Sequence, residues 1–300
     1  MNSRQATKWT TVLFTLLTTI YACSPPSQPT LPSTQIPSTS TPQPTLTSVP
    51  PTNTSTATQT PLACLNQPGR VEEGKLESTN PAQDYFIYLP PCYDEKTDQL
   101  YPVLYLLHGQ TYTYDQWLRL GVVDVVNDLI LAGESVPFII VFPDDRYWNV
   151  PAGSGFGLRL VDHLIPYIDQ NYRTIRDQDQ RAIGGMSRGA GWALRLGLTR
   201  WQLFGTIGLH SLAVLQKDSS KISEWLSAIP RASQPRVFMD VGDNDQELVM
   251  AQRVEEQLNR YGLSHEWHLY SGAHTEEYWR AHVEEYIRWY AEDWNKALSQ

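Results

Sequence analysis

The 300-residue sequence has few cysteines and few basic residues, and each shortage argues against a class of protein. It has only 3 cysteines and no cluster of other metal ligands beside them, which argues against a metal-binding site. Basic residues are outnumbered, 23 Lys and Arg against 32 Asp and Glu, and this acidity argues against nucleic acid as a partner. The length of the sequence and its 41% of hydrophobic residues fit one large domain plus extra sequence.

The N-terminus has the features of an export signal. Arg4 and Lys8 precede an apolar run at residues 12–20, which is too short and too rich in threonine to indicate a membrane span. The run ends in Ile-Tyr-Ala-Cys at residues 20–23, which resembles the bacterial lipobox. We expect residues 1–22 to be a lipoprotein-type signal peptide and Cys23 to be lipidated. The alternatives are a signal cleaved without lipidation and an uncleaved anchor.

Residues 23–61 have the composition of a disordered stalk. They are almost wholly Pro, Thr, Ser and Gln, and so cannot bury enough apolar surface to fold. At about 3.1 Å per residue in the polyproline form, such a stalk could hold a domain on the order of 100 Å from a membrane. We therefore expect an exported protein, at the cell surface or in the periplasm, that meets the membrane through its lipid anchor only.

Cys64 and Cys92 are the two cysteines left once Cys23 is assigned to lipidation. In an exported protein such a pair is expected to form a disulfide. Closing a loop of this length would stabilise the fold by about 3 kcal/mol in the loop-entropy model.

From residue 62 to residue 300, apolar strand patterns alternate with helical patterns. Strands are expected near 84–90, 101–109, 138–143, 181–184, 205–209, 236–241 and 265–270, and helices near 120–132, 157–170, 188–199, 247–261 and 276–297. This alternation predicts an α/β fold with a mostly parallel sheet covered by helices on both faces. Ligands of such sheets bind at the carboxyl ends of the strands.

The segment Gly185-Met186-Ser187-Arg188-Gly189 lies between a predicted strand and a predicted helix. A bare G-x-S-x-G arises by chance, but the strand before it and the helix after it are the context of a nucleophile elbow. Small flanking residues let the strand and the helix pass closely, and the helix N-terminus favours developing negative charge. We therefore interpret Ser187 as the candidate nucleophile.

A serine nucleophile needs a histidine base and an acid that orients it. In an α/β-hydrolase the triad residues follow one another in the order Ser, Asp or Glu, His. His274 lies on a loop between the last predicted strand and the last predicted helix, where the histidine of this order is expected. Asp243 and Asp245 both follow the strand near 236–241, and we favour Asp245 as the acid, with Asp243 as the alternative. His210, at a strand end near Ser187, is expected to line the pocket.

The oxyanion of the reaction needs preorganised N–H donors. The backbone N–H groups of Arg188, directly after the nucleophile, and of Gln110, in the loop after the strand near 101–109, are our candidates. Near other strand ends or loops lie Trp117, Trp148 and Trp279, which could form an aromatic platform for a phenolic or sugar group, with ordinary packing as the alternative.

In combination, these motifs resemble the Putative esterase family of the α/β-hydrolases, which includes feruloyl esterases, S-formylglutathione hydrolases, enterochelin esterases and the antigen 85 mycolyltransferases. The resemblance covers about residues 70–295 and rests on residues 106–109, 185–189, 242–245 and 272–274, with the helix at 163–169 also similar. It implies an α/β-hydrolase fold and carries over Ser187, Asp245 and His274 as a triad, with Gln110 and Arg188 as oxyanion donors. Many members have Met where this chain has Arg188, and we expect that side chain either to shape the pocket or to reach an acidic neighbour.

We therefore predict an exported serine carboxylesterase that works through an acyl-enzyme and needs no cofactor. From location and family, the expected substrates are feruloyl-type or acetyl-type esters of cell-wall polysaccharide, or small esters. The alternatives are an acyltransferase that uses the same triad and a catalytically inactive surface lipoprotein that binds glycan.

Overall fold

The structure, a computed structural model, describes residues 63–146 and 155–296. The predicted signal peptide, Cys23 and the stalk lie outside these residues, as does Trp148, so the expectations for them stay predictions. In the described part of the chain, no helix is long and apolar enough to cross a membrane.

The described residues form one eight-stranded sheet with the strand order β1-β2-β4-β3-β5-β6-β7-β8. The pairs β1–β2 and β2–β4 are antiparallel, and all the other pairs are parallel. The strands are β1 (Arg70–Leu76), β2 (Gln83–Leu89), β3 (Val103–Leu107), β4 (Ile139–Pro143), β5 (Arg181–Met186), β6 (Thr206–His210), β7 (Arg236–Gly242) and β8 (His265–Tyr270). The predicted α/β fold with a mostly parallel sheet is confirmed.

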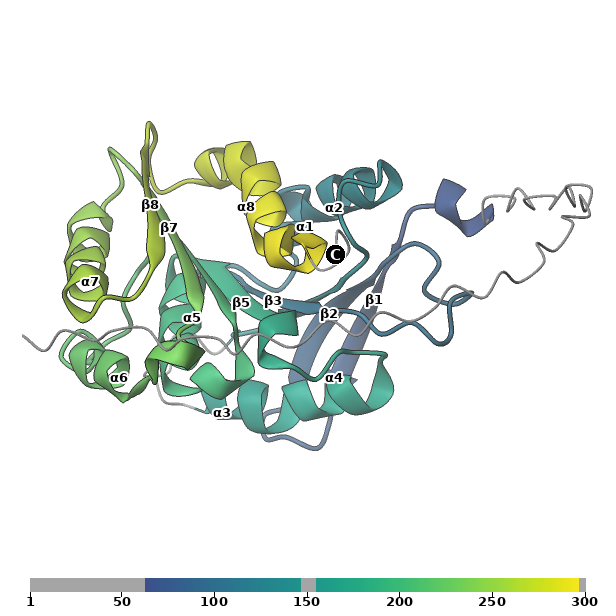
Figure 1. Cartoon of the computed structure of the whole chain (residues 1–300), viewed down its shortest axis with the longest axis horizontal. Helices are drawn as coiled ribbons and strands as arrows, with labels where there is room; N and C mark the ends of the chain where they lie inside the picture. Colours follow the sequence, from purple (N-terminus) through teal and green to yellow (C-terminus); the bar gives the residue numbers. More distant parts are fainter. Residues whose placement is uncertain (1–62, 147–154, 297–300) are drawn as a thin grey trace, which may run out of the picture. The chain divides into compact units, whose positions relative to one another are not determined.

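Helices cover both faces of the sheet (Figure 1). Side chains of α1 (Gln116–Arg119), α2 (Val122–Leu131) and α8 (Glu276–Lys296) pack into one core cluster with Leu104 and Leu106 of β3. Tyr105 and Leu107 of the same strand point into the second cluster, because successive side chains of a strand alternate between faces. The helices on that second face are α3 (Phe156–Leu158), α4 (Ile165–Asn171), α5 (Arg188–Thr199), α6 (Ile222–Ala228) and α7 (Leu248–Tyr261), and a π-helical turn (Arg159–Leu164) leads into α4.

The order of the strands fixes where a site can form. From β3 the chain moves to β4 on one side, and it then returns to β5 on the other side of β3. Loops at the carboxyl ends of β3 and β5 therefore lead to helices on opposite faces of the sheet, and ligands of open α/β sheets bind at such a point. The loop that starts at His108 and the turn at Ser187 are these two loops.

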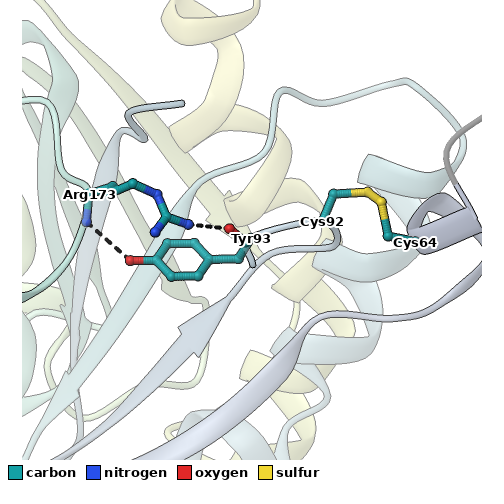
Figure 2. Close-up of a disulfide and its surroundings, with 4 residues drawn as sticks. All are labelled: Cys64, Cys92, Tyr93 and Arg173. Carbon is teal, nitrogen blue, oxygen red and sulfur yellow. Dashed lines mark hydrogen bonds between the residues drawn. A yellow bond between two sulfur atoms is a disulfide. The ribbon is translucent and has the colours of Figure 1, made fainter. Parts of the chain in front are cut away.

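A disulfide joins Cys64, in the 3₁₀ turn Ala63–Asn66, to Cys92, just after β2 (Figure 2). The next residue, Tyr93, is held by Arg173: the Arg173 N–H donates to the Tyr93 hydroxyl at 3.1 Å, and the guanidinium stacks 3.8 Å above the ring. Because β2 is antiparallel to β4, the end of β2 that carries Cys92 lies at the opposite edge of the sheet from the carboxyl ends of the parallel strands. The bridge therefore fastens the start of the domain on the side away from Ser187.

Candidate active site

Ser187 occupies a strained backbone position between β5 and α5, with φ 54° and ψ −120°. A positive φ is uncommon for a residue other than glycine and persists only where its surroundings hold it. Here the Ser187 N–H donates to the carbonyl of His210 at 2.9 Å, and the Ser187 carbonyl accepts from the N–H groups of Gly191 and Ala213 at 3.1 and 3.2 Å. Bonds from both neighbouring segments thus fix the turn that carries the serine.

The two glycines of the G-x-S-x-G motif are needed for close packing. A Cβ on Gly185 would lie 2.6 Å from the backbone of Gly189, and one on Gly189 would lie 2.3 Å from the carbonyl oxygen of Leu107. Both distances are shorter than real Cβ contacts, so a side chain at either position would push α5 away from β3 and β5.

His274 and Asp245 are brought together, although the loops that carry them are 29 residues apart in the sequence. Nδ1 of His274 lies 2.9 Å from both carboxylate oxygens of Asp245, whose side chain is fully buried. Asp245 also accepts a hydrogen bond from the N–H of Glu247 at 2.8 Å and one from Ser211. Burial alone would raise the pKa of the Asp245 carboxyl, but these hydrogen bonds bring that pKa below its ordinary value, so the group is an anion at neutral pH.

Asp243, the alternative acid, has a different role in the structure. It is exposed, and its carboxylate accepts from the N–H of Gly272 at 3.0 Å. The N–H of Asn244 donates to the Gly272 carbonyl at 2.8 Å, so the loop after β7 holds the loop that carries His274. The hydrogen bonds therefore favour Asp245 as the partner of the imidazole.

The loop after β3 lies beside the serine. A Cβ on Gly109 would be 3.7 Å from the Cβ of Ser187. Gln110, the candidate oxyanion donor of this loop, is exposed, and Arg188 is the first residue of α5, so its N–H has no partner within that helix. The structure thus places the segments that carry both candidate donors next to the serine.

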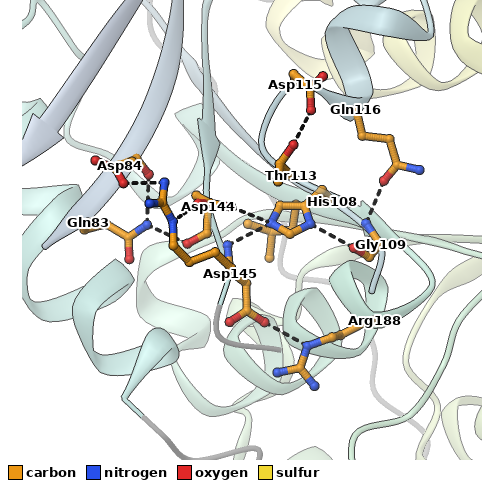
Figure 3. A network of polar contacts seen from close by, with 12 residues as sticks. Gln83, Asp84, His108, Gly109, Thr113, Asp115, Gln116, Asp144, Asp145 and Arg188 are labelled. Carbon is orange, nitrogen blue, oxygen red and sulfur yellow. Dashed lines mark hydrogen bonds and ion pairs between the residues drawn. The ribbon is translucent and has the colours of Figure 1, made fainter. Parts of the chain in front are cut away.

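The Arg188 side chain reaches an acidic neighbour. Its Nε lies 2.8 Å from the carboxylate of Asp145 (Figure 3). The same carboxylate also accepts from Nε1 of Trp192 at 2.8 Å. Both members of this ion pair are buried. Of the two expectations for the Arg188 side chain, the structure favours the ion pair.

The expectation that Trp117 and Trp279 form an open aromatic platform does not hold. Trp117 is 1% exposed and donates from Nε1 to the Leu107 carbonyl at 3.0 Å. Trp279 is 2% exposed, donates to the Ser211 hydroxyl at 3.0 Å and presents its ring edge-to-face to His274, with ring centroids 5.0 Å apart. Sequence position near a strand end does not say which way a side chain points, and both indoles point into the core.

His210 is not a pocket residue either. It is fully buried, and its two ring nitrogens lie 2.6 Å from a carboxylate oxygen of Asp240 and 2.9 Å from the hydroxyl of Tyr290. Tyr278 and Tyr286 of α8 donate to the other oxygen of Asp240, each at 2.7 Å. This network fastens α8 to β6 and β7 beneath the site.

Sequence reasoning missed two residues that hold the site: Ser211, which accepts from Trp279, and Gln116, which accepts from the N–H of Gly109 beside the candidate donor Gln110. Ser211 directly follows His210 at the carboxyl end of β6, and that position was the available signal. For Gln116, the partner Glu276 is 160 residues away, and no local pattern indicates that contact. Among the described residues no group of three or more His, Cys, Asp or Glu could hold a metal ion.

Comparison with known proteins identifies the family of the chain. The model of the family described as "Putative esterase" matches residues 77–290, which is more than half of the chain. The chain belongs to this family. The predicted family membership is confirmed.

Two curated relatives share parts of this esterase-family sequence. The "Endo-1,4-beta-xylanase/feruloyl esterase" of Xylanibacter ruminicola is 34% identical over 146 residues, which are 45% of this chain and 20% of the relative. "Esterase Rv1288" of Mycobacterium tuberculosis is 30% identical over 192 residues, which are 58% of this chain and 40% of the relative. The chain thus spans less than half the length of either relative.

Solved structures share the fold of this family member. A ferulic acid esterase superposes with a TM-score of 0.67 at 24% identity and covers 75% of this chain and 99% of its own. A ferulic acid esterase from Anaeromyces mucronatus, solved with ferulic acid, superposes with a TM-score of 0.62 at 22% identity. The match covers 73% of this chain and 90% of the other. S-formylglutathione hydrolase from Staphylococcus aureus superposes with a TM-score of 0.59 at 15% identity, and the match covers 75% of this chain and 98% of the other.

Proposed function

We propose that the chain is a serine carboxylesterase in which Ser187, His274 and Asp245 form the catalytic triad. The observation that carries the proposal is the pairing of the His274 imidazole with the buried Asp245 carboxylate at 2.9 Å. This pair belongs to loops at the same edge of the sheet as the strained serine. A histidine whose Nδ1–H is held by a carboxylate presents Nε2 as the base.

In the acylation step His274 Nε2 takes the proton of the Ser187 hydroxyl as Oγ bonds to the ester carbonyl carbon. The carbonyl oxygen becomes an anion, which the backbone N–H groups of Arg188 and Gln110 stabilise; one such donor contributes roughly 3 to 4 kcal/mol to transition-state stabilisation. Collapse of this intermediate breaks the bond to the alcohol, which takes the proton from His274. Water, activated by the same imidazole, then cleaves the acyl-enzyme and restores Ser187.

We further propose that the substrates are feruloyl-type or acetyl-type esters of cell-wall polysaccharide. Support comes from the relatives: the named activity of the Xylanibacter ruminicola protein includes feruloyl esterase, and the Anaeromyces mucronatus structure was solved with ferulic acid. Export and lipid anchoring at Cys23 belong to the same proposal, since a polysaccharide substrate lies outside the cell. Fractionation of producing cells tests this placement, and recovery from the cytosol would contradict it.

A panel of esters tests the substrate class. The full chain and Ser187→Ala are compared on p-nitrophenyl acetate, p-nitrophenyl butyrate, methyl ferulate and acetylated xylan. We expect Ser187-dependent turnover of methyl ferulate or acetylated xylan to exceed that of the butyrate ester in kcat/KM. Turnover of the p-nitrophenyl esters alone would reject the polysaccharide-ester proposal, and no turnover of any ester by the folded wild-type chain would reject the esterase.

A further inference from the structure

The N–H of Gln110 can serve as an oxyanion donor only if its direction is fixed, and the residue before it is a glycine. Gly109 links two peptide groups, and without a side chain it can turn freely about both of its torsions. In the structure each of these peptide groups is held by a different buried side chain (Figure 3). The loop is thus held on both sides of its most flexible residue.

Gln116 holds the first peptide group. Its Oε1 accepts the Gly109 N–H at 2.8 Å, and the side chain is fully buried in α1. The other end of the same amide is held too, because Nε2 lies 3.3 Å from Oε1 of Glu276, whose carboxylate Arg119 also binds at 2.9 and 3.1 Å. Glu276 lies two residues after His274, so one amide side chain connects the loop of the candidate base with the loop of the candidate oxyanion donor.

His108 holds the second peptide group. The backbone N–H of Asp145 donates to Nε2 of His108 at 2.8 Å, and since a backbone N–H can only donate, the ring proton is on Nδ1. Nδ1 lies 2.8 Å from the carbonyl oxygen of Gly109 and donates to it. Asp144 Oδ1 lies 3.3 Å from the same Nε2, but the shorter contact to the Asp145 N–H makes this nitrogen an acceptor.

Because the peptide group is planar, the hydrogen bond from His108 to the Gly109 carbonyl also sets the direction of the Gln110 N–H. In a trans peptide, C=O and N–H point in opposite directions. Because the Gly109 carbonyl points to the His108 ring, the Gln110 N–H must point away from that ring. Thr111, the next residue, has φ 69°, a position that a β-branched residue adopts only where its surroundings hold it.

We propose that Gln116 and His108 are positioning residues that fix the two peptide groups of Gly109 and thereby direct the Gln110 N–H at the oxyanion. This inference rests on the proposed esterase function. Neither side chain needs to touch the substrate, so the expected signature is a loss in kcat with little change in KM, because the oxyanion exists only in the transition state and the tetrahedral intermediate.

The chain offers a matched control for Gln116. Asn127 of α2 also uses a buried amide oxygen to accept a glycine N–H, that of Gly69, at 2.7 Å. It lies at the Cys92 end of β2, where it also accepts from the Tyr88 hydroxyl at 2.7 Å. Asn127→Leu therefore removes the same kind of hydrogen bond away from the serine.

The test compares kcat, KM and thermal unfolding of the full chain with those of Gln116→Met, Gln116→Asn and Asn127→Leu on p-nitrophenyl acetate. Met and Asn withdraw the acceptor from Gly109, and we expect kcat to fall roughly 10- to 100-fold with KM within about threefold, less than the loss of a whole donor. Asn127→Leu should lower the melting temperature but leave kcat within about twofold.

The inference is overturned if Gln116→Met and Gln116→Asn lose no more kcat than Asn127→Leu. If one of the two acceptor-removing variants does not fold, the other carries the comparison. A wild-type chain without Ser187-dependent turnover would instead reject the proposed function, and the positioning role with it.

Discussion

At the scale of single residues, two neighbouring aspartates with the same chemistry have different surroundings. Asp245 is buried and binds the imidazole of His274, whereas Asp243 is exposed and binds only backbone and the Asn244 amide among the described contacts. Only the first can hold a tautomer and stabilise the imidazolium that forms during acylation. The side chain of Asp243 is therefore expected to matter for the shape of the loop and not for proton transfer.

Substitution of each aspartate tests this assignment. Asp245→Ala should lower kcat on p-nitrophenyl acetate by roughly 10³- to 10⁴-fold, as loss of the acid does in other triads. Asp243→Ala should lower it by less than about tenfold, because the Asn244–Gly272 backbone bond remains. A larger loss from Asp243→Ala than from Asp245→Ala would reverse the assignment.

The same carboxylate makes stability depend on pH. The folded-state pKa of Asp245 lies below its ordinary value, so its contribution to stability is present above the unfolded-state pKa of about 4 and is lost as pH falls through the folded-state pKa. Asp245→Asn should therefore be less stable than wild type at pH 7, and urea unfolding at a series of pH values should show the difference shrinking below about pH 4. A difference that grows toward acid pH would mean that the carboxylate is not stabilised by its partners.

At the scale of elements, the central strands and the edge strand β8 were predictable, but the edge strand β1 was not. β3, β4, β5 and β6 are buried on both faces, which gives continuous apolar runs that stand out in a sequence. β1 was missed because it is an edge strand whose side chains are mostly exposed, so its residues include Glu72, Glu73 and Lys75 and show no apolar alternation. The short helices α1 and α6 were missed because too few turns are present to show a period.

The disulfide gives a prediction at this scale. Cys64 and Cys92 close a loop with a sequence separation of 28, so reduction should destabilise the domain by about 3 kcal/mol in the loop-entropy model. For a domain of this size that lowers the melting temperature by roughly 6 to 12 °C. Because the bridge lies at the edge of the sheet away from Ser187, kcat measured well below the melting temperature should change less than about twofold. The measurements are thermal unfolding and turnover of Cys64→Ser/Cys92→Ser beside wild type, and a large loss of kcat in the folded variant would contradict this placement.

At the scale of the whole molecule, sequence reasoning identified the fold and the candidate residues at the carboxyl ends of the strands. This was possible because the motifs and the alternation of strands and helices can be read directly from the sequence. Sequence reasoning did not identify the contacts that fix the directions of these side chains and backbone N–H groups. The hydrogen bond from the Gly109 N–H to Gln116 depends on where α1 packs. The hydrogen bond from Gln116 to Glu276 joins positions 160 residues apart. The predicted roles of Trp117 and Trp279 were wrong for the same reason: each indole points to the core side of its helix, which only the packed structure reveals.

The central claim is that Ser187 is acylated with His274 as its base, and covalent trapping tests it most directly. The full chain is incubated with a fluorophosphonate, which forms a stable bond to activated serines, and the modified residue is located by peptide mass spectrometry. We predict one label per chain, on Ser187, no label in Ser187→Ala, and labelling at least about 100-fold slower in His274→Ala, since a serine without its base is a poor nucleophile. A label on another residue, or ester turnover that persists in Ser187→Ala, would contradict the account.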